Sequence, residues 1–347
     1  MRWLAVVLLC GVSLGAQVTT PDEKNWEAVC KKATSAPLAA PELKGPLSAA
    51  QLPQCDAEGL YYGFKGAVDN AAALQCAWWQ RAHPQPSRGD MFYGAGVLTM
   101  LYANGRGVAK SYDLALRFAC EQTSAAPAEM EYRIGHLEAL RDGKMPATKP
   151  LDLCDDGTSG LSMGACEAVT QRLADKKRMG SADTTAKQLP ESAKPAFAKL
   201  QTAETAFEHA RASGGGEIDM TGTARGAFSL EEEGRLKDQF QINLQRFAKG
   251  DLPAATAADV TKLDAEMNDV YRGLQNSQKY KNASGGAVTA LGIQKAQRAW
   301  LPLRDAWIAF AAKAYPGLTR ERVEAQLIRL RLHQLRSLAG SNNKVEN

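Results

Sequence analysis

Near the C-terminus, residues 293–310 place apolar and polar side chains at the spacing of an amphipathic helix. The apolar residues recur every three or four positions, and they are Ile293, Ala296, Trp300, Leu303, Trp307 and Phe310. The polar residues between them include Gln297, Arg298, Arg304 and Asp305. A stripe of this kind turns one face of a helix toward a protein core. The pattern therefore predicts a helix with one buried face, around which neighbouring helices pack.

A weaker copy of this helix occurs earlier in the chain. Residues 200–211 align with residues 293–304 without a gap, so that Phe207 takes the place of Trp300 and Gln201 that of Gln294. Because the same polar and apolar types fall at the same helical positions, we infer two copies of one helical unit.

Further helices are expected around the second copy. Thr256 and Asp259 have the spacing of a capping box, and apolar residues follow at helical spacing through Leu274. A polar loop over 275–286 separates this helix from residues 293–310, and a last helix is expected over 319–338. Together these segments predict an antiparallel three-helix unit.

The first copy predicts a similar unit. We expect helices over 194–212 and 230–247, preceded by a helix through Cys166 and Leu173. The expected domains are residues 151–250 for the first unit, 251–340 for the second unit and 341–347 for a tail.

Residues 55–150 carry a degenerate repeat of leucines and cysteines. Its three copies run from Leu60 to Cys76, from Leu101 to Cys120 and from Leu137 to Cys154. In the central copy, glycines at positions 105 and 107 suit a tight turn between two helices. The repeat predicts three helical hairpins. The expected fold class is therefore all-α, with helical-hairpin repeats followed by two related three-helix units.

The N-terminus has the pattern of an export signal. Residues 1–16 contain one basic residue, a short apolar run and small residues near the end, which is typical of a cleavable secretion signal and too short for a stable membrane span. In an alternative interpretation Cys10 carries a lipid, but the preceding Val-Leu-Leu lacks the usual small side chains. Residues 17–54, rich in Pro and Ala, are expected to form an extended or loosely packed lead-in. We expect a periplasmic or secreted protein.

Removal of this signal leaves an even number of cysteines, which predicts three disulfides formed in an oxidising compartment. Equivalent positions in stacked hairpins lie about 10 Å apart, beyond the roughly 7 Å that a disulfide spans between Cα atoms, so we do not expect Cys76 to pair with Cys120. Cys154 and Cys166 would close a short loop and are the favoured pair. The remaining connectivity stays open among the six, which are Cys30, Cys55, Cys76, Cys120, Cys154 and Cys166.

Charge and composition limit the chemistry. A formal net charge of +4 over 347 residues argues against nucleic acid as the main partner, because phosphate binding needs a dense cationic face. From Lys295 to Arg336 basic residues outnumber acidic ones, which indicates a solvated face or contact with an anionic envelope component. The four histidines lack metal-ligand spacing and the cysteines are assigned to disulfides, so we expect no metal and no cofactor.

Residues 160–164 fit the Gly-x-Ser-x-Gly pattern of serine hydrolases, with Ser162 as the nucleophile. That pattern works on a sharp turn between a strand and a helix of an α/β sheet. No strand is predicted before Gly160, and the residues from Asp155 to Ser162 suit helix capping instead. We therefore expect a protein that is not an enzyme.

The second unit resembles the N-terminal-like domain of the LprI lysozyme inhibitors. The matching residues are Leu263, Asn268 and Tyr271, then Gln297, Arg298, Trp300, Leu303, Arg304 and Asp305, then Arg331 and Leu335. The first unit keeps Cys166, Asp175, Gln201 and Phe207 of this pattern. The resemblance covers residues 150–340 approximately, although the second unit lacks the cysteines that often tie the second helix of such a unit to the third. The hairpin with Gly105 and Gly107 resembles the Sel-one-like repeats, relatives of the tetratricopeptide repeat.

We interpret most of the shared residues as structural. Trp300 is expected to fill the bundle, and Arg304 to meet a neighbour of Asp305 or a backbone carbonyl. The family's inhibitory role would then belong to other, exposed residues.

The resemblance implies an exported protein that binds another protein such as a lysozyme and blocks its cleft. Because a glycosidase works through two carboxylates, donors placed against them would inhibit it. The loop over 275–286 offers Lys279, Tyr280 and Lys281 as such donors, and residues 214–217 are its counterpart in the first unit. The alternative is a cell-envelope scaffold that binds its partner through the hairpin repeats. Neither hypothesis involves nucleic acid or stable membrane insertion.

Overall fold

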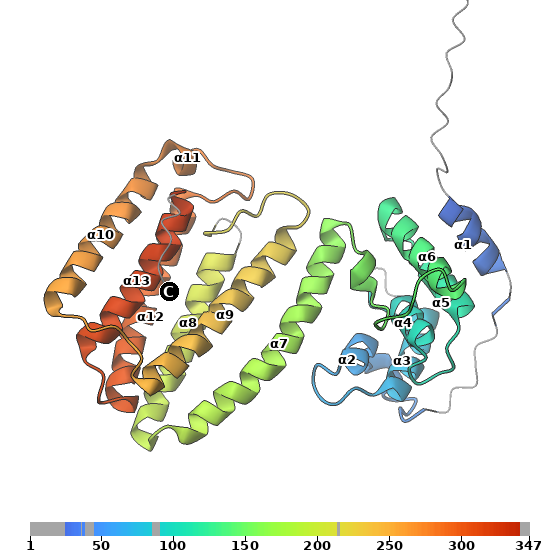
Figure 1. Cartoon of the computed structure of the whole chain (residues 1–347), viewed down its shortest axis with the longest axis horizontal. Coiled ribbons are helices and arrows are strands. Elements are labelled where there is room, and N and C mark those ends of the chain that lie inside the picture. Colours follow the sequence, from blue (N-terminus) through green and yellow to red (C-terminus); the bar gives the residue numbers. More distant parts are fainter. Residues whose placement is uncertain (1–24, 36, 39–44, 85–90, 214–215, 341–347) are drawn as a thin grey trace, which may run out of the picture.

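The computed structural model describes residues 25–35, 37–38, 45–84, 91–213 and 216–340. All regular elements in these ranges are helices, so the predicted all-α fold class is confirmed. Buried apolar residues form two cores, one within residues 30–169 and the other within residues 189–335. Figure 1 shows the corresponding two groups of helices, with the long helix α7 (Gly160–Gln188) between them. The expected signal at 1–16 and tail at 341–347 lie outside the described residues.

The first group contains two complete helical hairpins. The first hairpin pairs α2 (Ala57–Tyr62) with α3 (Asn70–Ala82), and the second pairs α4 (Ala95–Asn104) with α5 (Tyr112–Cys120). Gly105 and Gly107 in the second turn have φ values of 65° and 68°, in the left-handed region that favours glycine. The turn chemistry expected for the central repeat is therefore present.

The third expected hairpin lacks its second helix. Helix α6 (Pro127–Arg141) is followed by an irregular segment and a short 3-10 helix, η2 (Leu153–Asp156). Pro146 and Pro150 lie in this segment, where they remove backbone donors that a helix would need. Instead, Val169 and Leu173 in the N-terminal half of α7 pack against the first core.

The lead-in contains a helix that its composition did not predict, α1 (Asn25–Ser35), followed by η1 (Leu52–Gln54). Trp26, Val29 and Cys30 occupy one face of α1 and pack against the first core. The six cysteines form three disulfides, and these are Cys30–Cys120, Cys55–Cys76 and Cys154–Cys166. The first of them fastens α1 to α5, and the third is the pair favoured from the sequence.

The second group of helices is a bundle built from two similar halves. The first half comprises α7, the short 3-10 helix η3 (Glu191–Ala193), α8 (Lys194–Ala212) and α9 (Arg225–Lys249). The second half comprises α10 (Ala257–Asn276), α11 (Gln278–Lys281), α12 (Ala290–Ala314) and α13 (Arg320–Leu338). Helix α7 packs on α9 as α10 packs on α13, and the two related helices α8 and α12 pack on each other (Figure 1).

Aromatic side chains fill the space between the halves. Trp307 contacts Phe240, Phe247 and Phe310, with ring centroids 5.2, 4.8 and 6.0 Å away. Trp300 and Phe207, the aligned aromatic residues of the two copies, are only 4% and 3% exposed. Replacement of a buried Trp by Ala costs about 3–5 kcal/mol, so these side chains hold the two halves together.

Helix ends follow the expected local chemistry. Thr256 and Asp259 form the predicted capping box at the start of α10, and Gly250 ends α9 with a left-handed φ of 68°. Within the described ranges, no helix has the length and apolar character needed to cross a membrane.

Candidate functional site

The residues that carry the family resemblance in the second half lie mostly in its interior. Gln297 and Trp300 of α12 are buried, and Arg331 of α13 has no exposed side-chain surface. Arg304 lies with its guanidinium carbon 5.6 Å from the Trp300 ring centroid and donates to Asp305 at 3.0 Å. The burial of Gln297, Trp300 and Arg331 is compatible with a structural role. Arg304, however, pairs with Asp305 itself and not with one of its neighbours or a backbone carbonyl as expected.

Three further motif residues of this half, Leu263, Asn268 and Tyr271, are half-buried on α10. Asn268 donates to Asp264 at 2.9 Å, and burial raises the pKa of Tyr271. Gln201 of the first half is exposed. None of these residues forms a cluster that could carry out chemistry.

A buried ion-pair cluster joins the two halves. Arg331 donates to Glu217 at 2.8 Å and to Gln297 at 2.8 Å, and its guanidinium carbon lies 5.5 Å from the centroid of the Phe207 ring. Arg211 at the end of α8 lies 3.0 Å from the same Glu217 carboxylate. Since the side chains of Arg331 and Glu217 are both fully buried, this cluster fixes the segment after α8 against the second half.

That finding corrects one sequence-based expectation. Glu217 was part of the candidate contact segment 214–217, but it is 4% exposed and its carboxylate is occupied by two arginines. It is therefore not free to meet a partner. Residues 214 and 215 lie outside the described residues.

The loop between α10 and α12 places two of its three candidate donors on the surface. Lys279 and Lys281 in α11 are exposed. Tyr280 is only 5% exposed and donates its hydroxyl to the carbonyl of Leu338, so its assignment as a donor to a partner is corrected. The polar loop thus contains a short helix, which Tyr280 anchors to the end of α13 while its two lysines face outward.

The two connecting loops of the halves lie against each other. The backbone N–H of Met220, between α8 and α9, donates to the carbonyl of Gly286, between α11 and α12, at 2.8 Å. We call residues 216–224 and 277–289 together the loop end of the bundle; it lies around α11 in Figure 1. The sequence pointed to both loops, but it could not show that they are neighbours.

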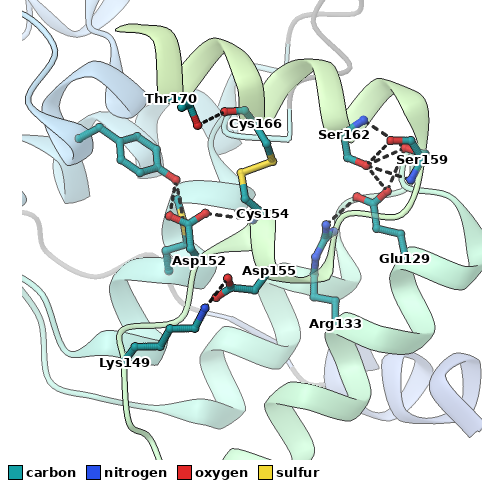
Figure 2. Close-up of a disulfide and its surroundings, with 12 residues drawn as sticks. Glu129, Arg133, Lys149, Asp152, Cys154, Asp155, Ser159, Ser162, Cys166 and Thr170 are labelled. Carbon is teal, nitrogen blue, oxygen red and sulfur yellow. Dashed lines mark hydrogen bonds and ion pairs between the residues drawn. A yellow bond between two sulfur atoms is a disulfide. The ribbon is translucent and has the colours of Figure 1, made fainter. Parts of the chain in front are cut away.

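Ser162 has a structural position rather than a catalytic one. It lies in the first turn of α7 and forms a capping box with Ser159, and its hydroxyl donates to the Glu129 carboxylate at 2.9 Å (Figure 2). Glu129 also accepts from Arg133 at 2.8 Å, so the carboxylate holds α7 to α6. His136 contacts Asp156 at 3.0 Å, but it lies two helical turns, about 10 Å, along α6 from Glu129. His136 is therefore not placed to act as a base for Ser162, and the carboxylate that accepts from Ser162 is already paired with Arg133.

A hollow of about 660 Å³ lies where the hairpins meet the start of α7 and α9. Its charged side chains are largely paired with one another: Arg81 with Glu121 at 2.6 Å, and Arg133 with Glu129 at 2.8 Å. These pairs neutralise most of the charge in the lining; Arg225, which also lines the hollow, donates to the carbonyl of Gly222 at 3.1 Å.

Two buried carboxylates on α8 have perturbed acidity. Burial raises the pKa of Glu204 well above its usual value, and the nearby Glu208 carboxylate adds to the effect. Burial likewise raises the pKa of Glu208, to about 7. Glu204 lines a hollow of about 40 Å³ between α8, α9 and α12, together with Trp300 and Trp307. These carboxylates are buried in the bundle, so they bear on its stability rather than on a surface site.

Over the described ranges, no group of three or more His, Cys, Asp or Glu side chains could hold a metal ion. Asp155 is paired with Lys149 at 2.7 Å (Figure 2). Asp156 is the partner of His136.

Comparison with known families gives one match. Residues 247–338 match the family described as lysozyme inhibitor LprI. The match begins in the last residues of α9 and covers α10 to α13, so it corresponds to the second half of the bundle. No curated protein and no solved structure matches the chain. The resemblance of the first half to the same family, and that of the hairpins to Sel-one-like repeats, stay predictions.

Proposed function

Because residues 247–338 match the lysozyme inhibitor LprI family, we propose that this protein is an exported inhibitor that binds a muramidase and obstructs its cleft. The family match carries this proposal, since the inhibitor role belongs to the family whose pattern the second half shares. The interior position of the motif residues supports an inhibitor whose contacts come from loops mounted on a rigid bundle.

The loop end supplies suitable contacts for such a role. A muramidase uses two carboxylates flanking the scissile bond. Lys279 and Lys281 are exposed on α11, and Tyr280 between them is fixed in the bundle. Because Tyr280 fixes the backbone of α11, the segment that carries the two lysines would lose little backbone freedom when their ammonium groups enter an acidic cleft, which favours binding.

Export is supported by two observations. The first is the N-terminal sequence, which has the pattern of a cleavable signal. The second is the presence of three disulfides, which form and persist mainly in oxidising compartments. A periplasmic or secreted location would bring the protein together with muramidases that act on the cell envelope.

A muramidase assay tests the proposal. Cell-wall suspensions are lysed by a muramidase with increasing amounts of the mature full-length chain, and the rate of clearing is followed. We expect inhibition that saturates near one chain per enzyme. The double variant Lys279→Glu/Lys281→Glu should weaken inhibition at least about tenfold, because the reversed charges would face the catalytic carboxylates.

The matched control is Lys313→Glu, which reverses another exposed lysine, in the last turn of α12. It should inhibit as well as the wild-type chain does. If a stoichiometric excess of wild-type protein leaves muramidase activity unchanged across several enzyme classes, the inhibitor function is wrong.

A scaffold function for the hairpins is the second candidate, favoured by the exposed aromatic Tyr132 on α6, which is 65% exposed. Exposed aromatic residues often anchor protein partners. In that case Tyr132→Ala should abolish capture of envelope proteins by the full-length chain, while Lys279→Glu/Lys281→Glu should leave that capture unchanged.

A further inference from the structure

A groove beside the loop end gathers exposed apolar and acidic side chains. Two hollows, of about 260 and 480 Å³, share Phe228 and Glu231 in their walls and so form one continuous surface. Met163 and the Cys154–Cys166 disulfide line one end of it, and Ile218 and Asp219 line the other. We call this surface the α7/α9 groove.

The apolar part of the groove is unusually open to solvent. Phe228 is 41% exposed and Met163 is 43% exposed, although both are large hydrophobic side chains. Apolar side chains gathered in a hollow with a polar rim are typical of protein interaction sites. The groove therefore has the composition of a binding surface.

The groove is also rigidly built. Helices α7 and α9 approach so closely at their starts that a Cβ on Gly160 would lie 2.2 Å from the backbone carbon of Thr223. The disulfide holds the start of α7 to η2 (Figure 2). Glu232 forms an ion pair with Arg211 at 2.6 Å. Because Arg211 also contacts Glu217, this pair joins the wall of the groove to the buried ion-pair cluster between the halves. A preformed surface of this kind loses little entropy when a partner binds.

The rim carries two exposed carboxylates, Glu231 and Asp219, beside the ion pair of Arg235 with Glu232. Glu231 is exposed, and no ion pair or hydrogen bond of its side chain occurs within the described part of the chain. Asp219 is exposed as well; hydrogen bonds from Thr221, and to a smaller extent the nearby charge of Lys279, hold the pKa of its carboxyl below the usual value, so it stays ionised. A cationic partner is thus favoured over an anionic one such as a lipid surface or nucleic acid.

A stable complex needs more contact area than the loop with Lys279 and Lys281 provides, and the adjacent groove offers that area. A standard interface buries about 800 Å² on each partner, more than the four-residue helix α11 can offer. The Met220 to Gly286 hydrogen bond, 2.8 Å long, makes the loop that leads into the groove continuous with the loop that carries Lys279 and Lys281. A protein seated on those lysines would reach the groove next.

We propose that the α7/α9 groove is the second contact surface for the inhibited muramidase and binds a cationic, partly apolar segment at the rim of its cleft. This inference rests on the proposed inhibitor function. Many lysozymes are basic overall but acidic at their catalytic centre. The loop end would bind the acidic centre, and the α7/α9 groove would bind the basic surface. The lysines of α11 meet the catalytic carboxylates, while Phe228, Glu231 and Asp219 meet the basic surface around them. The groove lies outside residues 247–338, so the first half of the bundle would contribute to specificity.

Binding kinetics of the full-length chain on an immobilised basic lysozyme test this inference. Phe228→Ala should raise the dissociation constant at least about tenfold, mainly through faster dissociation, because the complex loses an aromatic side chain that the partner would bury. Glu231→Lys should lower the association rate about tenfold at low salt, and this difference should shrink at high ionic strength.

Matched controls come from the same molecule. Ile242→Ala removes a side chain that is 47% exposed on α9, 14 residues or about 21 Å further along the helix. Glu131→Lys reverses an exposed charge on α6. Both controls should bind as the wild-type chain does. If Phe228→Ala and Glu231→Lys also bind like wild type, the groove proposal is overturned while the inhibitor function stands.

Two other outcomes separate the remaining possibilities. If the wild-type chain binds no muramidase, the inhibitor function and the groove proposal both fail. Sedimentation of the chain alone identifies a different occupant: a wild-type dimer that Phe228→Ala converts to a monomer would mean that a second copy of this chain fills the groove, which also overturns the proposal.

Discussion

Replacement of Glu217 by Gln probes the cluster that joins the two halves of the bundle. The substitution keeps the shape of the side chain but removes the charge that faces Arg331, 2.8 Å away, and Arg211, 3.0 Å away. The side chains of Arg331 and Glu217 are fully buried, so water cannot replace the lost partner. Loss of one member of a buried ion pair costs about 3–5 kcal/mol.

Urea unfolding measures this cost. Tryptophan fluorescence reports on the bundle through Trp300 and Trp307, which are both buried. With a denaturant slope of about 2–3 kcal/mol per molar urea, we expect the midpoint of the bundle transition to fall by about 1–2.5 M in Glu217→Gln.

The control is Asp305→Asn, which removes the charge from an exposed pair with Arg304. The Asp305 side chain is 63% exposed, and exposed pairs contribute at most about 1 kcal/mol. A midpoint shift in Glu217→Gln no larger than that of Asp305→Asn would refute the conclusion that the buried cluster stabilises the joint between the halves.

Three further predictions concern the bundle and its first helix. The Glu208 pKa is raised by burial to about 7 from its ordinary 4.5, so the fold favours the protonated acid. Titration of Glu208 should lower the free energy of unfolding by up to about 3 kcal/mol between pH 4.5 and 7. In urea titrations at several pH values, Glu208→Gln should remove this part of the pH dependence, while the part that comes from Glu204 remains. Ser162→Ala should lower the free energy of unfolding by about 1–3 kcal/mol, because the helix cap is lost and the buried Glu129 loses a donor; an unchanged thermal midpoint would contradict this. Gly160→Ala should cost about 1–3 kcal/mol, since the added methyl group meets the Thr223 backbone, whereas Gly180→Ala on the same helix, with open space around it, should be neutral or stabilising.

Periodicity predicted the bundle well. The apolar stripe of α12 and the gapless alignment of its weaker copy placed Trp300 and Phe207 at equivalent buried positions. The Thr256 capping box marked the start of α10 because local hydrogen bonds at a helix end depend on residues only three positions apart. Interactions between residues a few positions apart, such as helix periodicity and capping, can be predicted from the sequence alone.

The elements that were missed depend on distant contacts. Helix α1 is held by Cys30–Cys120 across 90 residues of chain, and its alanine- and proline-rich surroundings gave no sign of it. In the loop after α10, only Tyr280 distinguishes the buried face of α11, too little for a periodic pattern. The predicted third hairpin failed because Pro146 and Pro150 interrupt the segment where its second helix was expected.

The candidate site was predictable only in part. The exposed lysines 279 and 281 followed from loop chemistry, but the pairing of Glu217 with Arg331 spans 114 positions and no local pattern reveals it. The contact between the two connecting loops comes from packing of the two halves against each other. The groove around Phe228 comes from packing of α9 and the loop before it against α7 and η2.

Amide hydrogen exchange of the full-length chain, measured with and without a saturating basic muramidase, tests most directly whether the loop end is where this protein binds its target. We predict slower exchange over residues 216–231 and 277–289, with little change in α2 to α6. Slower exchange confined to residues 55–141, with the loop end unaffected, would contradict the account and place the binding surface on the hairpins.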